Sequence, residues 1–425
     1  MDSASDQVCG EAPAEVGEQE GNGLSVNESE TASVASKSAL PRSVKVVGLA
    51  SLLNDTASEM IYPLLPHFLL HVLLGNRFYL GVIEGIADSV ASFVKLWSGD
   101  QSDRAGQRKG FIVFGYCVPA LVRPVIGLTV APWQLFGIRV LDRIGKGVRS
   151  SPRDALIADS TDHSIRGRAF GFHRAMDNLG AAIGPLLAAG FLWLWPNELR
   201  TLFLIAFVPG LLVVMLLVFG LREKIIPQPT HERLRLTLKP FDRSFRVYLL
   251  SLVVFTLGNS SDVFLLVRAG ELGVPTAMLP LLWCACHIAK SASNLLLGRT
   301  VDRIGSRPAL FLGWLAFAGV YLAFGVATSV WEVWTFFIVY GLACGLIEPA
   351  ERALVGYLVG VGRKGLAYGW YNFAIGIATL PSSLIFGGLY QYFGPLVAFV
   401  WGSGLALIAA IILMGVAVKP IAKSA

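Results

Sequence analysis

Ionisable side chains stand inside several of the longest apolar stretches of this 425-residue chain. In LLNDTASEMIYPLLPHF, Asp55 and Glu59 are four residues apart, which places them on one face of a helix, one turn apart. Two carboxylates so close repel each other when both are ionised, so the pair is a candidate for binding a proton or another cation. A helix cap at Asn54 and Asp55, combined with a salt bridge, explains the same residues equally well.

The stretch LFGIRVLDRIGKGVRSSPRDALIAD is rich in charge and carries Arg139, Asp142, Arg143, Lys146, Arg149, Arg153, Asp154 and Asp159. Four basic residues follow one another at helical spacings of 4, 3 and 7 and so form one stripe, made of Arg139, Arg143, Lys146 and Arg153. Such a stripe suits the binding of an anionic substrate, because guanidinium groups fit carboxylates and phosphates. For Arg149 and Arg153, at its end, we favour ordinary cytoplasmic charge.

Further ionisable residues stand in other apolar stretches. Glu84 and Asp88 repeat the spacing of four, but nearer the outer end of their stretch, where they would face water. Asp177 follows a histidine by four residues, and we interpret Glu351 with Arg352 as a structural pair near the cytoplasm. Ten side chains are our candidates for proton coupling or substrate binding: Asp55, Glu59, Arg139, Asp142, Arg143, Asp177, Asp262, His287, Lys290 and Glu348.

Motifs of other function classes are missing from the sequence. We find no nucleophile, metal-ligand or nucleotide-binding pattern, and no polar joint is long enough to hold a catalytic or ligand-binding domain. Four of the five cysteines lie in apolar runs, where they are expected to pack. We therefore predict a protein that is not an enzyme, with no catalytic residue, no metal site and no cofactor.

The composition indicates the elements that carry these charges. Hydrophobic residues make up 54% of the chain and charged ones 15%, with a mean hydropathy of +0.61, which is typical of a polytopic membrane protein. Apolar runs of about 20 residues predict an all-α protein with twelve transmembrane helices, at about 44–74, 79–98, 110–130, 133–158, 168–195, 199–221, 245–268, 275–297, 308–328, 332–357, 366–391 and 394–417.

The polar segments divide the chain into parts. We predict a disordered acidic cytoplasmic tail over 1–42, a six-helix bundle over 43–221, a cytoplasmic linker over 222–243, a second six-helix bundle over 244–418 and a short cytoplasmic tail over 419–425. Basic residues gather in the joints on the side of the termini, whereas the opposite joints hold little beyond Arg77 and Arg200. Both termini are therefore predicted to be cytoplasmic, in a plasma (inner) membrane, and the basic excess indicates no nucleic-acid partner.

A charged phrase between the second and third spans returns in the second half. SGDQSDRAGQRKG at 98–110 resembles GRTVDRIGSRP at 298–308, at an offset of 199, so the chain is a duplicated six-helix unit. We interpret the two phrases as a cytoplasmic gate that latches in one state, formed by Gly99, Asp103, Arg104, Gly106, Arg108, Gly298, Asp302, Arg303, Gly305 and Arg307. The alternative is a basic loop that only fixes topology.

At these residues the chain resembles the major facilitator superfamily. GDQSDRAGQRK resembles the signature loop G-x-x-x-D-R-x-G-x-R-[RK], and Leu135 with Arg139 resembles the start of the fourth-helix motif. Gly180, Gly184 and Pro185 resemble the core of the antiporter motif G-x-x-x-G-P, although close packing of small residues explains them too. The resemblance implies two pseudo-symmetric six-helix bundles that rock about a central site in alternating access.

We therefore predict a secondary transporter whose partners are a small-molecule substrate, protons and the lipid bilayer, acting as a monomer. The first hypothesis is a proton-coupled antiporter for efflux of a small polar or charged solute or drug. The alternative is a proton symporter or facilitator for uptake of a small anionic metabolite. Carboxylates at mid-depth can couple to a gradient worth about 2.3 kcal/mol per charge per 100 mV in either direction.

Overall fold

The computed structural model describes residues 40–161, 166–222, 238, 241–359 and 364–417, and for 166–167, 295–303 and 364–366 only the backbone. The acidic tail over 1–39 and most of the predicted linker over 222–243 lie outside these residues, as does the end of the chain from 418. The domain boundaries therefore stay predictions. Leu40–Ala425 cluster as one compact unit, and the description below concerns that unit.

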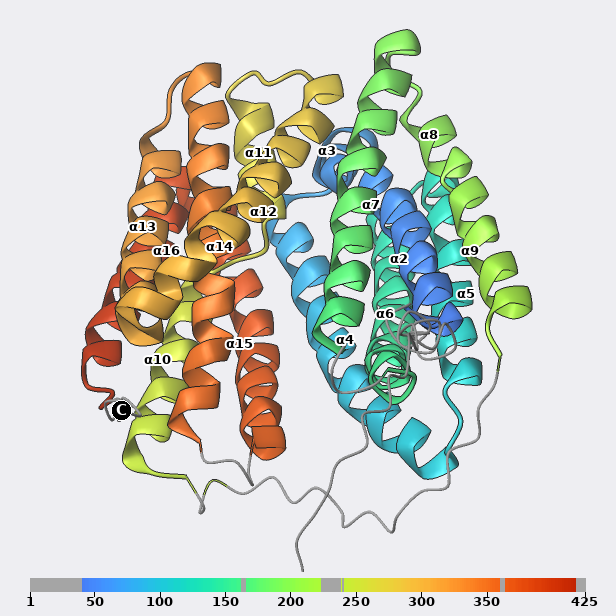
Figure 1. The fold of residues 1–425 in the computed structure, drawn as a ribbon. Coiled ribbons are helices and arrows are strands. Elements are labelled where there is room, and N and C mark those ends of the chain that lie inside the picture. The colour runs from blue at the N-terminus through green and yellow to red at the C-terminus, as the bar shows by residue number, and fades with distance from the viewer. Residues whose placement is uncertain (1–39, 162–165, 223–237, 239–240, 360–363, 418–425) are drawn as a thin grey trace, which may run out of the picture. The chain divides into compact units, whose positions relative to one another are not determined.

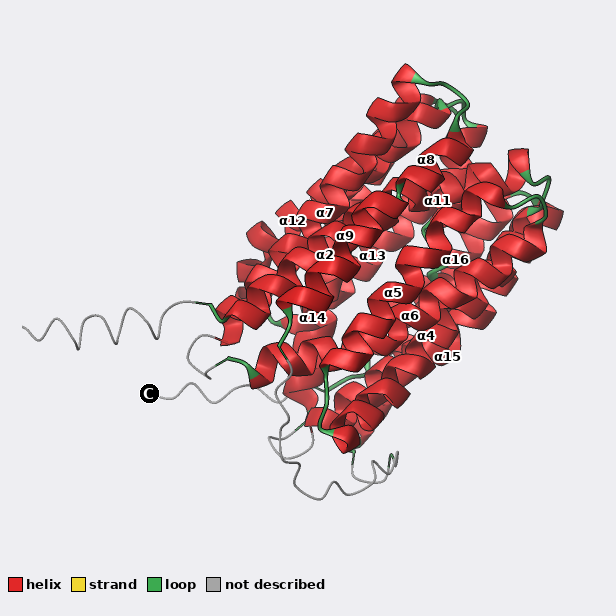
Figure 2. Ribbon diagram, turned by 90° about the vertical axis from the view of Figure 1, so that its right-hand side faces the viewer, coloured by secondary structure: helices red, strands yellow, loops and turns green. Residues whose placement is uncertain are grey.

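Helices account for all regular structure among the described residues, which confirms the predicted all-α fold class (Figure 2). The first half contains α2 (Arg42–Ile61), η1 (Tyr62–Leu64), α3 (Leu65–His67), η2 (Phe68–Val72), α4 (Arg77–Ala105), α5 (Lys109–Val125), η3 (Ile126–Leu128), α6 (Pro132–Asp159), α7 (Arg166–Leu194), α8 (Leu199–Ile205) and α9 (Phe207–Gly220). The second half contains α10 (Arg243–Gly258), α11 (Val263–Glu271), η5 (Thr276–Met278), α12 (Leu279–Ile304), α13 (Ser306–Val326), α14 (Val330–Leu358), α15 (Lys364–Phe393) and α16 (Pro395–Met414).

These helices group into twelve stretches that coincide with the predicted spans. Within the described part of the chain, eight stretches are long and apolar enough to cross a membrane. The other four are α2 to η2, α4, α6 and α12, which carry many of the ionisable candidates and so have less apolar windows. That these four also cross the membrane stays a prediction. If they do, their charged side chains need ionic partners or an aqueous cavity.

The helix contacts repeat between the two halves. In the first half α2 packs against α7, α4 against α6, and α9 against both α2 and α5. In the second half α10 packs against α15, α12 against α14, and α16 against both α10 and α13. The halves meet where α4 contacts α15 and where α7 contacts α12, two contacts that the duplication also relates (Figure 1). The fold is therefore two pseudo-symmetric bundles, as predicted.

Two of the helical stretches are interrupted along their length. After α2, Pro63 and Pro66 remove backbone donors, and the chain passes through 3-10 and π turns as far as Val72. The seventh stretch breaks between Gly258 and Val263, which separates α10 from α11.

Small residues let α7 approach α2 closely. A Cβ atom added at Gly180 would lie 2.4 Å from the carbonyl oxygen of Leu52, and one at Gly184 would lie 2.5 Å from that of Thr56. Either distance is far below van der Waals contact, so a larger side chain would force the helices apart. This geometry accounts for the glycines of the G-x-x-x-G-P pattern by packing, whatever role Pro185 has in a hinge.

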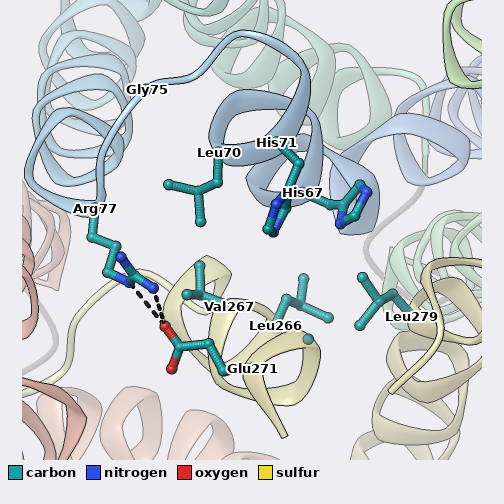
Figure 3. Close-up of a pocket in the computed structure, with 10 residues that line it drawn as sticks. His67, Leu70, His71, Gly75, Arg77, Leu266, Val267, Glu271 and Leu279 are labelled. Atoms are coloured by element: carbon teal, nitrogen blue, oxygen red, sulfur yellow. Dashed lines mark hydrogen bonds and ion pairs between the residues drawn. The ribbon is translucent and has the colours of Figure 1, made fainter. Parts of the chain in front are cut away.

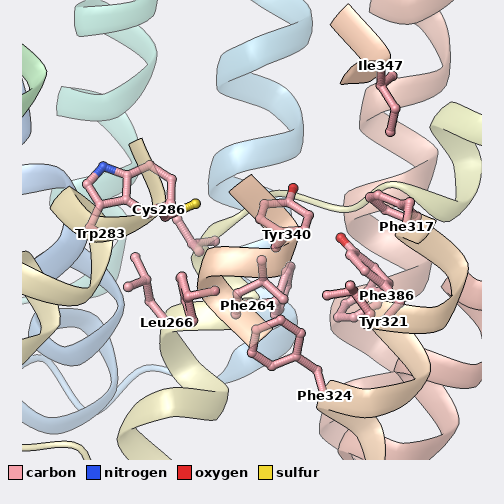
Figure 4. Close-up of a cluster of buried hydrophobic side chains, with 14 of the residues drawn as sticks. Phe264, Leu266, Trp283, Cys286, Phe317, Tyr321, Phe324, Tyr340, Ile347 and Phe386 are labelled. Atoms are coloured by element: carbon pink, nitrogen blue, oxygen red, sulfur yellow. The ribbon is translucent and has the colours of Figure 1, made fainter. Parts of the chain in front are cut away.

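An aromatic cluster fills the second half (Figure 4). Phe255 stacks on Trp314 with ring centroids 4.7 Å apart, and Phe317 stacks on Tyr321 at 4.1 Å. Trp314, Phe317 and Tyr321 are fully buried. Such rings contribute large buried apolar area to the core of this bundle.

Candidate substrate cavity

A cavity of about 540 Å³ lies between the two halves, lined by α2, η1, α5, α6 and α7 from the first and by α12 and α14 from the second. Its lining carries four acidic side chains, Asp55, Glu59, Asp177 and Glu348. It also carries eight basic ones, Arg123, Arg143, Lys146, Arg149, Arg153, Arg174, Lys290 and Arg352. A polar cavity of this size between bundles suits a small charged solute.

Asp55 and Glu59 project from α2 into the cavity, as the spacing of four predicts. Asn54 donates a hydrogen bond to Asp55 (2.8 Å), and the indole N–H of Trp283 donates one to Glu59 (2.7 Å). No basic nitrogen lies within 4 Å of either carboxylate among the described residues. Neither carboxylate therefore has the salt bridge that the capping interpretation requires.

The basic face of α6 forms another wall of the cavity. Lys146 is exposed to the cavity, and no acidic oxygen lies within 4 Å of it in the described part of the chain. Arg149 is only 4% exposed, lies 4.3 Å over the ring of Tyr116 and donates to the carbonyl of Gly115 (3.3 Å). Arg149 and Arg153 thus line the cavity, and their place on the cytoplasmic side stays a prediction. Both stand on the part of α6 beyond Lys146, and α6 packs against α5 and contacts α2.

A buried ionic network lies behind this wall. Arg139 donates two hydrogen bonds to Glu84, from Nε (2.9 Å) and from Nη2 (2.8 Å), and lies 3.4 Å from Asp142. Arg123 donates to Asp142 (2.7 Å), and Arg143 lies 3.0 Å from Asp88. These pairs join α4, α5 and α6.

The network changes the interpretation of Glu84. This side chain is 1% exposed and bridges two arginines of α6, whereas we expected it to face water. The sequence contains the signal, because Glu84 and Asp88 on one helix match the spacing of Arg139 and Arg143 on another. Two acids and two bases at the same helical spacing can pair across a helix contact.

The second half supplies fewer ionisable groups to the cavity. Lys290 on α12 pairs with Glu348 on α14 at 2.5 Å, and the ring of His287 lies 4.8 Å from that of Trp283. Asp262 accepts a hydrogen bond from Tyr340 and does not line the cavity.

Glu351 also departs from its expected place. It is 6% exposed and accepts a hydrogen bond from the hydroxyl of Tyr371 (2.8 Å), whereas its neighbour Arg352 is exposed and lines the cavity. The sequence places both residues near the end of a predicted span, but they lie on different faces of α14. The side chain of Glu351 is buried, whereas that of Arg352 is exposed at the cavity. The pair that we expected near the cytoplasm does not form.

The structure brings together seven of the ten predicted candidates: Asp55, Glu59, Arg143, Asp177, His287, Lys290 and Glu348. Arg139, Asp142 and Asp262 do not line the cavity, because packing partners already bind them. Asp177 lies 3.5 Å from His173 and 3.8 Å from Arg174 on its own helix. The lining residues that the sequence analysis did not single out share no motif: Ser58, Tyr62, Arg123, Ser150, Arg174, Asn178, Ala181, Trp283, Ser291, Asn294 and Pro349.

The signature loop forms a cluster within the first half. Arg108 contacts Asp103 and lies 3.4 Å from Asp159 at the end of α6, and Arg104 pairs with Asp100 (2.8 Å) on α4. Gly106 adopts φ 60° where α4 ends.

The other gate residues are more distant or are not described. Gly99 lies against Ser151 of α6. Gly305 adopts φ 90°, and Arg307 donates to the carbonyl of Met414. The side chains of Asp302 and Arg303, like Gly298, lie outside the described residues. A latch between the halves therefore stays a prediction.

Contacts on the side opposite the signature loop join the two halves (Figure 3). Arg77 of α4 donates to Glu271 of α11 (2.8 Å), and Glu271 also accepts from Tyr390 (2.6 Å). The backbone N–H of Arg77 donates to Gln391 (3.0 Å). We call these four residues the far-side cluster.

The sequence profile of the Major Facilitator Superfamily matches residues 47–289 and 248–424. The chain belongs to this superfamily. It is thus an integral membrane protein whose family and fold are those of transporters.

Similar proteins agree with this assignment. An uncharacterized MFS-type transporter of Methanocaldococcus jannaschii is 30% identical over 381 residues, which cover 88% of this chain and 95% of the relative. The multidrug resistance protein MdtH of Cronobacter sakazakii is 25% identical over 332 residues, covering 73% and 79%. The crystal structure of the human organic anion transporter MFSD10 shares the fold, with a TM-score of 0.61, 20% identity and coverage of 88% and 99%.

Proposed function

We propose that this superfamily member is a proton-coupled secondary transporter that exports a small charged solute by alternating access. The observation that carries the proposal is the pair Asp55 and Glu59, which line the cavity with no basic group within 4 Å in the part of the chain that the structure describes. A carboxylate without a basic partner, in a cavity enclosed by membrane helices, is suited to bind and release a proton as access alternates.

Orientation in the membrane forms part of the proposal. Arg104, Arg108 and Lys109 lie on the side where α2 begins, whereas the opposite joints hold little basic charge beyond Arg77 and Arg200. This asymmetry supports cytoplasmic termini in a plasma (inner) membrane. The far-side cluster would then hold the outer side closed while the cavity serves the cytoplasm. We propose that the monomer is the working unit.

The direction of transport has two candidates. Export by proton antiport is supported by the similarity to the relative named as a multidrug resistance protein, and by the glycines that fit the antiporter pattern. Uptake of a small anion with a proton is supported by Lys146 and Arg149, which line the cavity and, among the described residues, have no acidic partner within 4 Å.

A flux experiment tests the proposal. A growth screen of an expressing strain against toxic compounds supplies a substrate, and proton movement is then followed in everted and in right-side-out vesicles. We expect substrate efflux to drive proton entry, and Asp55→Asn with Glu59→Gln to abolish the proton signal. Glu198→Gln, at an exposed acid far from the cavity, serves as the control.

Each outcome separates the candidates. Protons that move together with the substrate would replace antiport by symport. Substrate transport that proceeds without any proton movement, or is unchanged in the double variant, would overturn proton coupling at these carboxylates.

A further inference from the structure

The cavity holds more positive than negative charge after its ion pairs are assigned. Five of its eight basic groups have an acidic oxygen within 4 Å, namely Arg123, Arg143, Arg153, Arg174 and Lys290. Lys146, Arg149 and Arg352 have none among the described residues. Among these residues, three cations without an acidic partner thus stand against two carboxylates without a basic one, Asp55 and Glu59. Arg352 lies alone on α14, whereas Lys146 and Arg149 lie together on α6.

These two side chains share one face of α6, three residues apart. Arg149 is held by the ring of Tyr116 and by the carbonyl of Gly115, and its buried Nε has no acceptor among the residues that the structure describes. Lys146 meets the cavity directly and has no acceptor at its ammonium group in the described part of the chain. Two neighbouring cations with no acidic oxygen within 4 Å, as found here among the described residues, are costly between membrane helices.

A solute that brings negative charge removes this cost. A guanidinium held in place by a ring presents its donors in a fixed plane that matches an oxyanion, and a nearby ammonium adds a point charge. Asp55 and Glu59 lie on the α2 wall of the same cavity. Among the described residues, neither carboxylate forms a salt bridge with Lys146 or Arg149. The cations are therefore available to a ligand.

We propose that the cavity recognises a small organic or inorganic oxyanion, a carboxylate or a phosphate, whose negative group binds at Lys146 and Arg149. The inference rests on the proposed transport function and names the substrate class of that same cavity. Arg143 lies next along the stripe but already pairs with Asp88, so it adds positive potential rather than a free donor.

Binding to the purified full-length protein tests this without any transport. Thermal unfolding in detergent is followed with carboxylates (acetate, succinate, benzoate), with phosphates (inorganic phosphate, phenyl phosphate), and with neutral and cationic analogues (succinamide, benzamide, benzylamine), at constant ionic strength. We expect an anion of one arm to raise the unfolding temperature more than its neutral or cationic analogue does. The arm that responds separates carboxylate from phosphate recognition.

Variants assign the site for the responding anion. Lys146→Gln is expected to weaken its affinity about tenfold or more, because a charge-assisted hydrogen bond is lost, whereas Lys146→Arg retains most of it. Lys45→Gln, at an exposed lysine of α2 outside the cavity, is the matched control. Arg149→Lys keeps the charge but loses the planar fork, so a smaller loss of affinity is expected there.

Two results would overturn the inference: no anion stabilises the protein more than its analogues, or Lys146→Gln binds the responding anion as tightly as the unmodified chain. Stabilisation by benzylamine instead would also overturn it. None of these binding results depends on the proton flux that Asp55 and Glu59 are proposed to support. The vesicle flux experiment therefore tests the proposed function separately.

Discussion

The two halves repeat one arrangement of helices but differ in what fills it. In the first half, buried ion pairs such as Arg139 with Glu84 join α4, α5 and α6. In the second half, α13 and α14, which the duplication relates to α5 and α6, meet through rings such as Tyr321 and Tyr340, with centroids 6.3 Å apart. The duplication has therefore kept the helix contacts while the two interiors have diverged.

This difference separates two kinds of charge in the first half. Arg139 and Glu84 are buried behind the cavity wall and pair with each other, so we expect their role to be structural. Asp55, Glu59 and Lys146 face the cavity with no ionic partner within 4 Å among the described residues, so we propose that they act on a solute or a proton. The second half offers the cavity a paired Lys290 and the ring of Trp283.

The largest predicted effect comes from breaking the buried network. Glu84→Gln leaves Arg139 without its bidentate partner, and removal of one member of a buried ion pair costs about 3–5 kcal/mol. Thermal unfolding and denaturant titration in detergent measure the loss. Replacing both members, as Glu84→Leu with Arg139→Met, is expected to recover most of the stability, because no unpaired charge is then left buried.

Asp88→Asn is the control on the same helix, since the side chain of Asp88 is 37% exposed where it meets Arg143. A loss there as large as at Glu84 would mean that burial does not distinguish the two acids. A double variant no more stable than Glu84→Gln would contradict a purely structural role for the pair.

The fold could be predicted from the sequence because the signals that indicate it are local or repeated. Hydropathy and the offset of 199 between two charged phrases are visible without any tertiary contact. The partners of individual charges were less accessible. Glu84 opposite Arg139 could have been inferred from matched spacing, but the hydrogen bond from Trp283 to Glu59 depends on how α12 meets α2. Burial of Arg149 depends on the packing of α5, which no pattern within α6 encodes.

A smaller effect is predicted where the two interiors meet. Trp283→Phe keeps an aromatic ring next to Tyr62 but removes the indole N–H that donates a hydrogen bond to Glu59. A hydrogen bond to a charged group contributes about 1.5–3 kcal/mol. We expect the halves to separate more often on the far side. Spin labels at Glu198→Cys and Thr328→Cys, in a background without the five native cysteines, would report a population at longer distance.

The same label pair with Glu59→Gln provides the matched test. The neutral amide of Glu59→Gln still accepts the hydrogen bond but carries no charge. The label distances in this variant should therefore fall between those of the unmodified chain and those of Trp283→Phe. An unchanged distance distribution in Trp283→Phe would show that this hydrogen bond does not hold the halves together.

The smallest effect is predicted at the far-side cluster. The side chains of Arg77 and Glu271 are 34% and 24% exposed, and Glu271 keeps Tyr390 and Arg268 as neighbours when Arg77 is lost. Because water screens partly exposed pairs, Arg77→Gln should cost about 0.2–1 kcal/mol. We expect it to increase the far-side open population less than about fivefold in the same label measurement. Lys45→Gln, at an exposed lysine of α2 outside the cavity and the far-side cluster, should cause no shift. A shift in Arg77→Gln as large as in Trp283→Phe would mean that the far-side cluster, rather than the cavity wall, sets the balance between the two halves.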